Sequence, residues 1–291
     1  MEQLDIFADS RDVILRNDVV DALLRRMPEA ARAACQVLAA EYPDDGALAS
    51  FTVLAGTLEA DSREPFGDHA ALAAARCELE ERIVPAAERA LPAAKVRAWL
   101  APCWCSLAQR ASALPFRAEQ SGCHAASLWL RAGEWDLARA GVEGIASWWR
   151  IPAPLEWMTE GCYRAEGLDV AWPRLAELAW LAPARFVALA NRLGDHVLDA
   201  LRRQFDAEFT GSGGVEDFSW FPAWLVVARP VLAKRLREAR VQRHVNAQRA
   251  ASTLWQILDL ERQGRQHELV EYRITLRNLH AGLYADYMKT R

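Results

Sequence analysis

The stretch Ala132-Gly133-Glu134-Trp135-Asp136-Leu137-Ala138 lies between two segments with a helical pattern of apolar residues. The stretch Glu166-Gly167-Leu168-Asp169-Val170-Ala171 repeats the arrangement, and its glycine follows the first by 34 residues. A glycine followed by a bulky and then a small residue allows two consecutive helices to close against each other. Recurrence at this distance predicts stacked antiparallel helix pairs that form an α-solenoid.

The composition is that of an ordinary folded protein, with 52% apolar and 25% charged residues in a chain of 291. Alanine and leucine dominate, and Gly and Pro separate segments of helical length. We therefore expect an all-α protein with a sizeable core, in one elongated domain or two smaller ones.

Apolar periodicity and helix-boundary residues predict a series of helices. They cover residues 11–27, 28–42, 47–58, 68–91 with an interruption near Pro85, 92–113, 118–131, 135–149, 154–166, 170–181, 184–193, 195–209 and about 231–245. A closing helix pair is expected on either side of Gly264. Pro102 should kink or divide the helix that contains it.

These elements suggest five regions along the chain. They are a flexible tail at 1–10, a helical region at 11–115, helical hairpins at 116–210, a flexible loop at 211–217 and a basic helical region at 218–291. The loop assignment depends on the run Thr210-Gly211-Ser212-Gly213-Gly214, since glycine gives the backbone most freedom.

Residues 118–209 resemble a divergent tetratricopeptide-repeat array. The matching positions are Gly133, Trp135, Ala138 and Pro152, followed more loosely by Gly167, Ala171 and Pro183. Leu168 stands where an aromatic residue is expected, and Gly194 follows Gly167 by only 27 residues. The resemblance implies a concave face that binds a protein or peptide, and it carries over no catalytic residue.

The segment Gln3-Leu4-Asp5-Ile6-Phe7 is similar to the pentapeptide by which bacterial replication and repair proteins dock on the DNA sliding clamp. In that interpretation Leu4, Ile6 and Phe7 enter an apolar cleft of the clamp while the Gln3 amide bonds its rim. In the alternative interpretation the three apolar side chains cover the end of the first helix pair, as terminal repeats require.

The carboxyl-terminal part is basic. Residues 228–291 contain 13 Lys/Arg and six Asp/Glu, a net charge of +7; because the chain carries −4, residues 1–227 carry −11. On the predicted helix 231–245, Arg237, Arg240 and His244 share a face, and Lys234 precedes them. Such a stripe can contact phosphates, so a nucleic-acid-binding protein is the alternative function. A packed helix with a charged outer side explains the same residues.

No motif predicts catalysis, a metal site or a cofactor. Cys103 and Cys105 would point about 200° apart on a helix, so with Cys123 and His124 they do not make a zinc site. We expect buried thiols instead. Glu156 and Glu160 lack the histidine partners of a carboxylate-bridged metal bundle and are assigned to solvated helix faces.

The first residues lack a signal-peptide pattern, and the longest apolar stretch, 218–233, is interrupted and too short to span a bilayer. A cytoplasmic location is therefore expected. Of the 35 basic residues only three are lysines, which is typical of a GC-rich bacterial genome. The sequence thus favours a non-catalytic helical adaptor that binds a protein partner, with residues 3–7 as a tether to the clamp.

Overall fold

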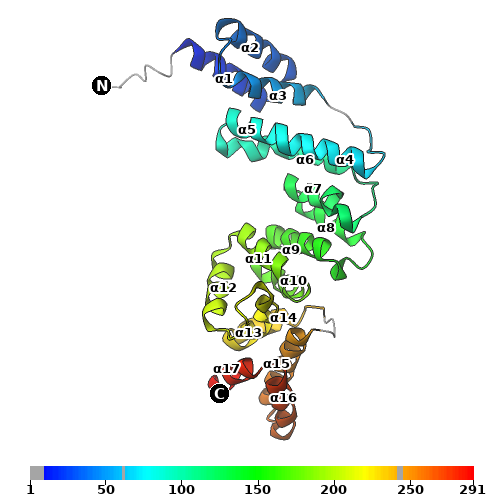
Figure 1. Ribbon diagram of the computed structural model, residues 1–291, viewed down its shortest axis with the longest axis vertical. Coiled ribbons are helices and arrows are strands. Elements are labelled where there is room, and N and C mark those ends of the chain that lie inside the picture. The colour runs from blue at the N-terminus through cyan, green and yellow to red at the C-terminus, as the bar shows by residue number, and fades with distance from the viewer. Residues whose placement is uncertain (1–9, 61–62, 241–244) are drawn as a thin grey trace, which may run out of the picture. The chain divides into compact units, whose positions relative to one another are not determined.

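A computed structural model of the chain describes residues 10–60, 63–240 and 245–291, and within them every regular element is a helix (Figure 1). The prediction of an all-α protein is confirmed. The chain divides into two compact units, Met1–Glu134 and Trp135–Arg291, each described here by itself. The segment Gln3-Leu4-Asp5-Ile6-Phe7 lies outside the described residues.

Unit 1 consists of helices, most of which pack against a neighbour along the chain. They are α1 (Arg11–Leu24), α2 (Pro28–Glu41), α3 (Leu48–Glu59), α4 (His69–Glu78), the π-helical turn η1 (Leu79–Ile83), α5 (Val84–Ala90), α6 (Ala93–Arg110), the 3-10 helix η2 (Ala118–Cys123) and α7 (Ala125–Ala132). Fully buried leucines of successive helices, such as Leu23, Leu38 and Leu54, form the core between them.

Unit 2 is also helical, and most of its consecutive helices pack together. Its elements are α8 (Trp135–Glu143), η3 (Trp148–Arg150), α9 (Pro152–Glu166), α10 (Leu168–Leu181), α11 (Pro183–Leu193), α12 (His196–Glu208), η4 (Val215–Trp220), α13 (Phe221–Ala228), η5 (Pro230–Leu232), α14 (Ala233–Leu236), α15 (Asn246–Gln263), α16 (Gln266–Leu279) and α17 (Ala281–Lys289). Phe205, Phe221 and Trp224 are buried against one another and form part of the core of this unit.

The glycines that were expected to join helices all have positive φ. The angles are 88° at Gly133, 88° at Gly167, 61° at Gly194 and 71° at Gly264. Each glycine ends one helix within two residues of the start of the next. Gly133, Gly194 and Gly264 are left-handed, whereas Gly167 combines its positive φ with an extended ψ of −177°. Either conformation ends a helix sharply, and glycine adopts it without a clash at Cβ.

Two prolines act differently on their helices. The predicted interruption near Pro85 is confirmed, because the turn before it widens to the π-helix η1. A proline ring clashes with the carbonyl four residues earlier, and a wider turn relieves that clash. At Pro102 a kink or a division was expected, and the division does not occur, since α6 runs through it as one helix.

Three predicted helices are shorter than expected. The helix expected at 135–149 ends at Glu143, and the 3-10 helix η3 follows only at Trp148. The helix expected at 118–131 begins as a 3-10 helix and restarts at Ala125, because His124 has an extended backbone and caps α7. The basic helix expected at 231–245 ends at Leu236, after only four α-helical residues. The residues from Arg237 to Arg240 instead take turns and irregular backbone that side chains of α10 and α15 hold in place.

The assignment of Glu156 to a solvated face is wrong. Its side chain on α9 is 10% exposed and bonds Arg185 and Arg192 of α11, at 2.6 and 2.9 Å. Glu160 joins the same cluster through Arg192, at 2.9 Å. Helix periodicity does not reveal which neighbour a charged residue meets, so sequence reasoning missed this link.

None of the described helices is long and apolar enough to cross a bilayer.

Candidate functional site

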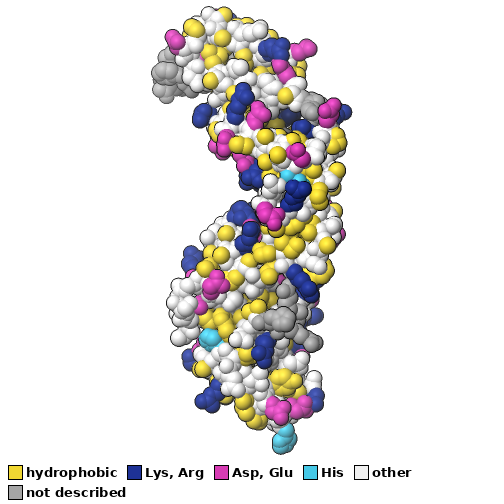
Figure 2. All heavy atoms as spheres, turned by 45° about the vertical axis from the view of Figure 1, so that its right-hand side comes forward, with side chains coloured by type: hydrophobic (Ala, Val, Ile, Leu, Met, Phe, Trp, Pro, Cys, Tyr) yellow, Lys and Arg dark blue, Asp and Glu magenta, His cyan; other side chains and the backbone are white. Residues whose placement is uncertain are grey.

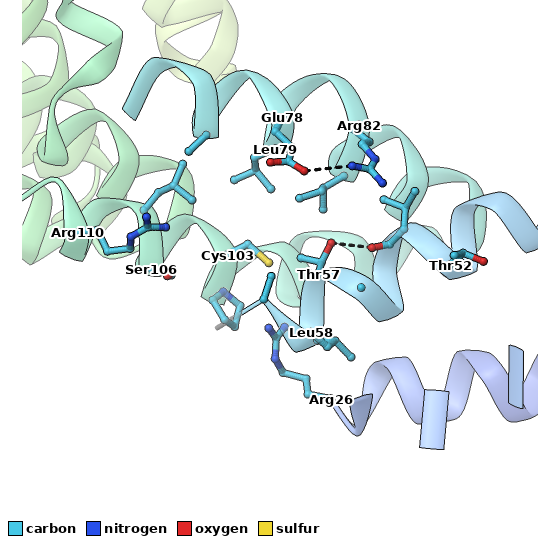
Figure 3. Close-up of a pocket in the computed structure, with 17 residues that line it drawn as sticks. Arg26, Thr52, Thr57, Leu58, Glu78, Leu79, Arg82, Cys103, Ser106 and Arg110 are labelled. Atoms are coloured by element: carbon cyan, nitrogen blue, oxygen red, sulfur yellow. Dashed lines mark hydrogen bonds and ion pairs between the residues drawn. The ribbon is translucent and has the colours of Figure 1, made fainter. Parts of the chain in front are cut away.

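A cleft of about 740 Å³ opens among the helices of unit 1 (Figure 3). Its walls come from α3, the α4–η1 segment and α6, and Arg26 reaches it from the turn between α1 and α2. Its volume is within the range of small-ligand sites, a few hundred to about 1,000 Å³. The aliphatic part of the lining consists mainly of Val53, Leu58, Leu79, Ile83 and Leu107.

Arg26 has a backbone conformation that is unusual for its residue type. Its φ is 56°, and the amide of Met27 donates to the carbonyl of Ala22 at 3.0 Å, which closes the turn after α1. Glycine is the common residue at this left-handed position, and a residue with a side chain is strained there. The guanidinium of Arg26 donates to the carbonyl of Trp99 at 3.0 Å, which ties the turn to α6.

Three more irregularities lie on the same cleft. Gly56 lies inside α3, where a Cβ would meet no atom within 4 Å, so packing does not require a glycine. Leu79 and Ile83 are the ends of the π-helix η1, and Pro102 stands inside α6. Each feature weakens a helix, and such departures concentrate where a backbone serves a function. Their convergence makes this cleft the leading site of unit 1.

The polar side chains of the cleft are mostly cationic. Arg26, Arg82 and Arg110 come from three elements and surround it in Figure 3, and with Glu78 they give a net charge of +2. Arg82 lies 3.2 Å from Glu78, but both side chains are exposed, so this pair is weak. Arg110 donates to the carbonyl of Glu64 at 2.8 Å. Its guanidinium also lies over the ring of Phe66.

Neither Arg26 nor Arg110 has a carboxylate partner among the described residues. A guanidinium carries five N–H donors, so donors remain beyond those that bind carbonyls. Cys103 lies between them on α6; burial raises the pKa of its thiol, and the Arg26 guanidinium opposes that rise. The cleft can therefore bind an anionic group, whereas its thiol is protonated at neutral pH.

A second hollow, of about 810 Å³, lies in unit 2 where α10 and α12 begin and η5 passes. Leu168, Trp172, Leu201 and Leu232 are among its lining residues. Val231 beside them is 89% exposed. Val197, which is 44% exposed, also lines the hollow, so two aliphatic side chains and the apolar lining form one solvent-exposed surface. Contiguous exposed apolar surface, rather than a single exposed side chain, is what marks a contact surface.

Arg237 and Arg240 of the predicted basic stripe lie beyond the end of α14 and do not share a helix face. Arg237 forms a bidentate pair with Asp259 of α15, at 2.7 and 2.8 Å, and so is neutralised within the fold. Arg240 lies over the rings of Trp148 and Trp149, at 4.7 and 4.9 Å from their centroids. Lys234 is exposed on α14, and His244 lies outside the described residues.

The Arg240 peptide is held from both sides. Its N–H donates to the buried carboxylate of Glu177 at 2.7 Å, and its carbonyl accepts from Gln248 at 3.0 Å. Desolvation raises the pKa of Glu177 above its ordinary value, and the guanidinium groups of Arg174 and Arg240 offset only part of this rise. On the face drawn in Figure 2, basic side chains are interspersed with acidic ones. The contacts of Arg237 and Arg240 thus give structural roles to two of the four residues that the stripe required.

Within the described part of the chain, no three His, Cys, Asp or Glu side chains are placed to hold a metal ion. Sequence reasoning did not find the cleft. The helix-interior Gly56 was a usable signal, because glycine there is unfavourable without a reason. The position of Arg26 had no such signal, since it depends on how α1 ends and on where α6 lies.

No protein-family model, no curated protein and no solved structure matches this chain. Inferences about its function therefore start from its own residues.

Proposed function

We propose that this protein is a non-catalytic helical-repeat adaptor whose helix pairs stack as an α-solenoid and bind a protein partner. The observation that carries the proposal is the apolar hollow of unit 2 with Val231 exposed beside it. A partner that inserts an aliphatic side chain there would bury both surfaces. Burying a valine side chain contributes about 1.5–3 kcal/mol.

The local structure is compatible with a repeat architecture. Helices joined at glycines with positive φ follow one another through unit 2, and consecutive helices pack together. Each helix pair can bury its apolar faces only against neighbouring pairs, which is the principle of a solenoid. Such arrays bind partners over a surface lined by several pairs.

We propose further that Gln3-Leu4-Asp5-Ile6-Phe7 tethers the adaptor to the bacterial sliding clamp, on the strength of the pentapeptide's residue types. Calorimetry with purified clamp tests this. Wild type should bind with a Kd of about micromolar, since ordering a short peptide opposes binding. A Leu4→Ala/Phe7→Ala variant should not bind. Absence of heat from wild type at tens of micromolar would exclude the tether.

The hollow is tested with Val231→Asp. Because the valine is solvated, the charge should leave the free energy of unfolding unchanged while disrupting the contact. Val215→Asp is the matched control, as Val215 is 41% exposed and does not line the hollow. Proteins captured from the native cell by wild type and Val215→Asp, but not by Val231→Asp, are then purified and titrated. Capture that is equal for all three rejects the hollow as the contact.

The alternative of nucleic-acid binding has a distinct outcome. Retention on DNA or RNA that falls steeply with added salt would favour it over the adaptor. The variant Lys234→Gln would then weaken retention, because Lys234 is an exposed cation of the predicted stripe.

A further inference from the structure

We propose that the cleft of unit 1 is a binding site for a small apolar carboxylate, meaning a ligand with a hydrophobic body and a single anionic head. This inference is independent of the adaptor proposal, because it concerns another unit and another class of ligand. The cleft lies wholly within unit 1, between α3, α4–η1 and α6.

The aliphatic lining fits the body of such a ligand. Leu79 and Leu107 are buried in the unit and line the cleft, while Val53, Leu58 and Ile83 remain partly accessible. A cavity of about 740 Å³ accommodates a molecule of drug size or smaller. Burial of the ligand's apolar surface would supply most of its binding free energy, at about 25 cal/mol per Å².

The unneutralised guanidinium groups fit the head. Arg26 and Arg110 donate to carbonyls of the fold and meet no carboxylate among the described residues. These bonds also hold each guanidinium in place, so its remaining N–H groups need less ordering when a ligand binds. Charge complementarity therefore selects an anion over a neutral or cationic molecule of the same shape.

The irregular backbone around the cleft supports a ligand site over a packing accident. Gly56 leaves room that alanine would fill at no steric cost, and Arg26 occupies a position where glycine would be less strained. An absent side chain at the first position keeps the cleft open, and a present one at the second places a cation at its rim. The glycine at position 56 and the arginine at position 26 both depart from local preference, and both shape the same cleft.

The probe is anilinonaphthalene sulfonate, an apolar anion that fluoresces when it leaves water. Its uncharged analogue phenylnaphthylamine has the same rings without the anion. The full chain should bind the anion at least tenfold more tightly than the analogue, since a charge-assisted pair contributes about that factor. Equal affinity for the two probes would overturn the proposal.

Two variants locate the site. Gly56→Phe places a ring in the open space and should reduce affinity for the anion at least tenfold. Arg110→Gln should weaken the anion about tenfold and leave the analogue unchanged. Arg25→Gln is the matched control, because Arg25 is exposed beside Arg26 and does not line the cleft. Circular dichroism confirms that each variant is folded.

Competition identifies the ligand class. Decanoate should displace the fluorescent anion from wild type, and decanol should do so much less. Displacement by an acidic peptide but not by decanoate would overturn the small-ligand assignment and indicate a peptide site. Anion affinity that is the same in wild type, Gly56→Phe and Arg110→Gln would place the probe elsewhere and reject the cleft.

Discussion

At the scale of single residues, two histidines do the work that Ser, Thr, Asp or Asn usually does at helix starts. The Nδ1 atom of His124 accepts from the amide of Ala126 at 3.2 Å, at the start of α7. The Nδ1 atom of His280 accepts from the amide of Leu283 at 2.9 Å, at the start of α17. An Nδ1 that accepts a hydrogen bond is unprotonated, so each cap requires a neutral imidazole.

This requirement predicts a pH dependence of stability. Burial, with a smaller contribution from His69, lowers the pKa of His124 from 6.5 to about 4. Between these values the unfolded chain binds the proton and the folded chain does not, so stability falls as pH falls from 6.5 toward 4. The loss attributable to His124 should be about 3 kcal/mol.

Urea unfolding at pH 7.5, 5.5 and 4.5 measures the effect. His124→Asn retains a cap acceptor without a titrating ring, so its stability should depend less on pH over this window. Burial also lowers the pKa of His280, which adds a residual dependence of the same sign. Parallel curves for the two proteins would show that His124 is not responsible.

Gly56→Ala should stabilise the protein by about 0.5–1 kcal/mol, because alanine has the higher helix propensity and restricts the unfolded chain. The added methyl group meets no atom within 4 Å, so no clash offsets the gain. Chemical unfolding measures the change in free energy. A destabilised variant would mean that other atoms fill this space in solution. That result would contradict the open cleft beside Gly56.

At the scale of elements, the helix ends marked by glycine were predicted better than the other helix boundaries. The prediction of turns at Gly133, Gly167, Gly194 and Gly264 is confirmed, because positive φ strongly favours a residue without Cβ. Of the kink or division expected at Pro102, the division does not occur. The early end of the basic helix was not foreseen. In the basic segment the contacts of Arg237 with α15 outweigh the local preference for helix.

Gly264→Ala should destabilise the protein by about 1 kcal/mol, since an L side chain is unfavourable at a φ of 71°. The space around this glycine is also open, so the loss would come from the backbone alone. Gly56→Ala is the matched comparison, because the same substitution at a helical φ should have the opposite sign. Equal effects at the two glycines would contradict this explanation.

At the scale of the whole molecule, the proposed solenoid should have a larger radius of gyration than a compact globule. A compact globule of this length has a radius of gyration of about 19 Å. Small-angle X-ray scattering of a stacked array should give a value clearly larger, and the profile should indicate an elongated particle. A radius near that of the globule would reject the solenoid while leaving the all-α class intact.

The amino-acid sequence by itself determined the helical class, the glycine-marked helix ends and the apolar positions of the core, because these depend on interactions within a few residues. Tertiary structure decided which charged residues meet, as between Glu156 and Arg192, and it brought Arg26, Gly56 and Pro102 to one cleft. Those neighbours are far apart along the chain. Their proximity depends on how whole helices pack, and the periodicity of apolar residues along one helix does not predict it.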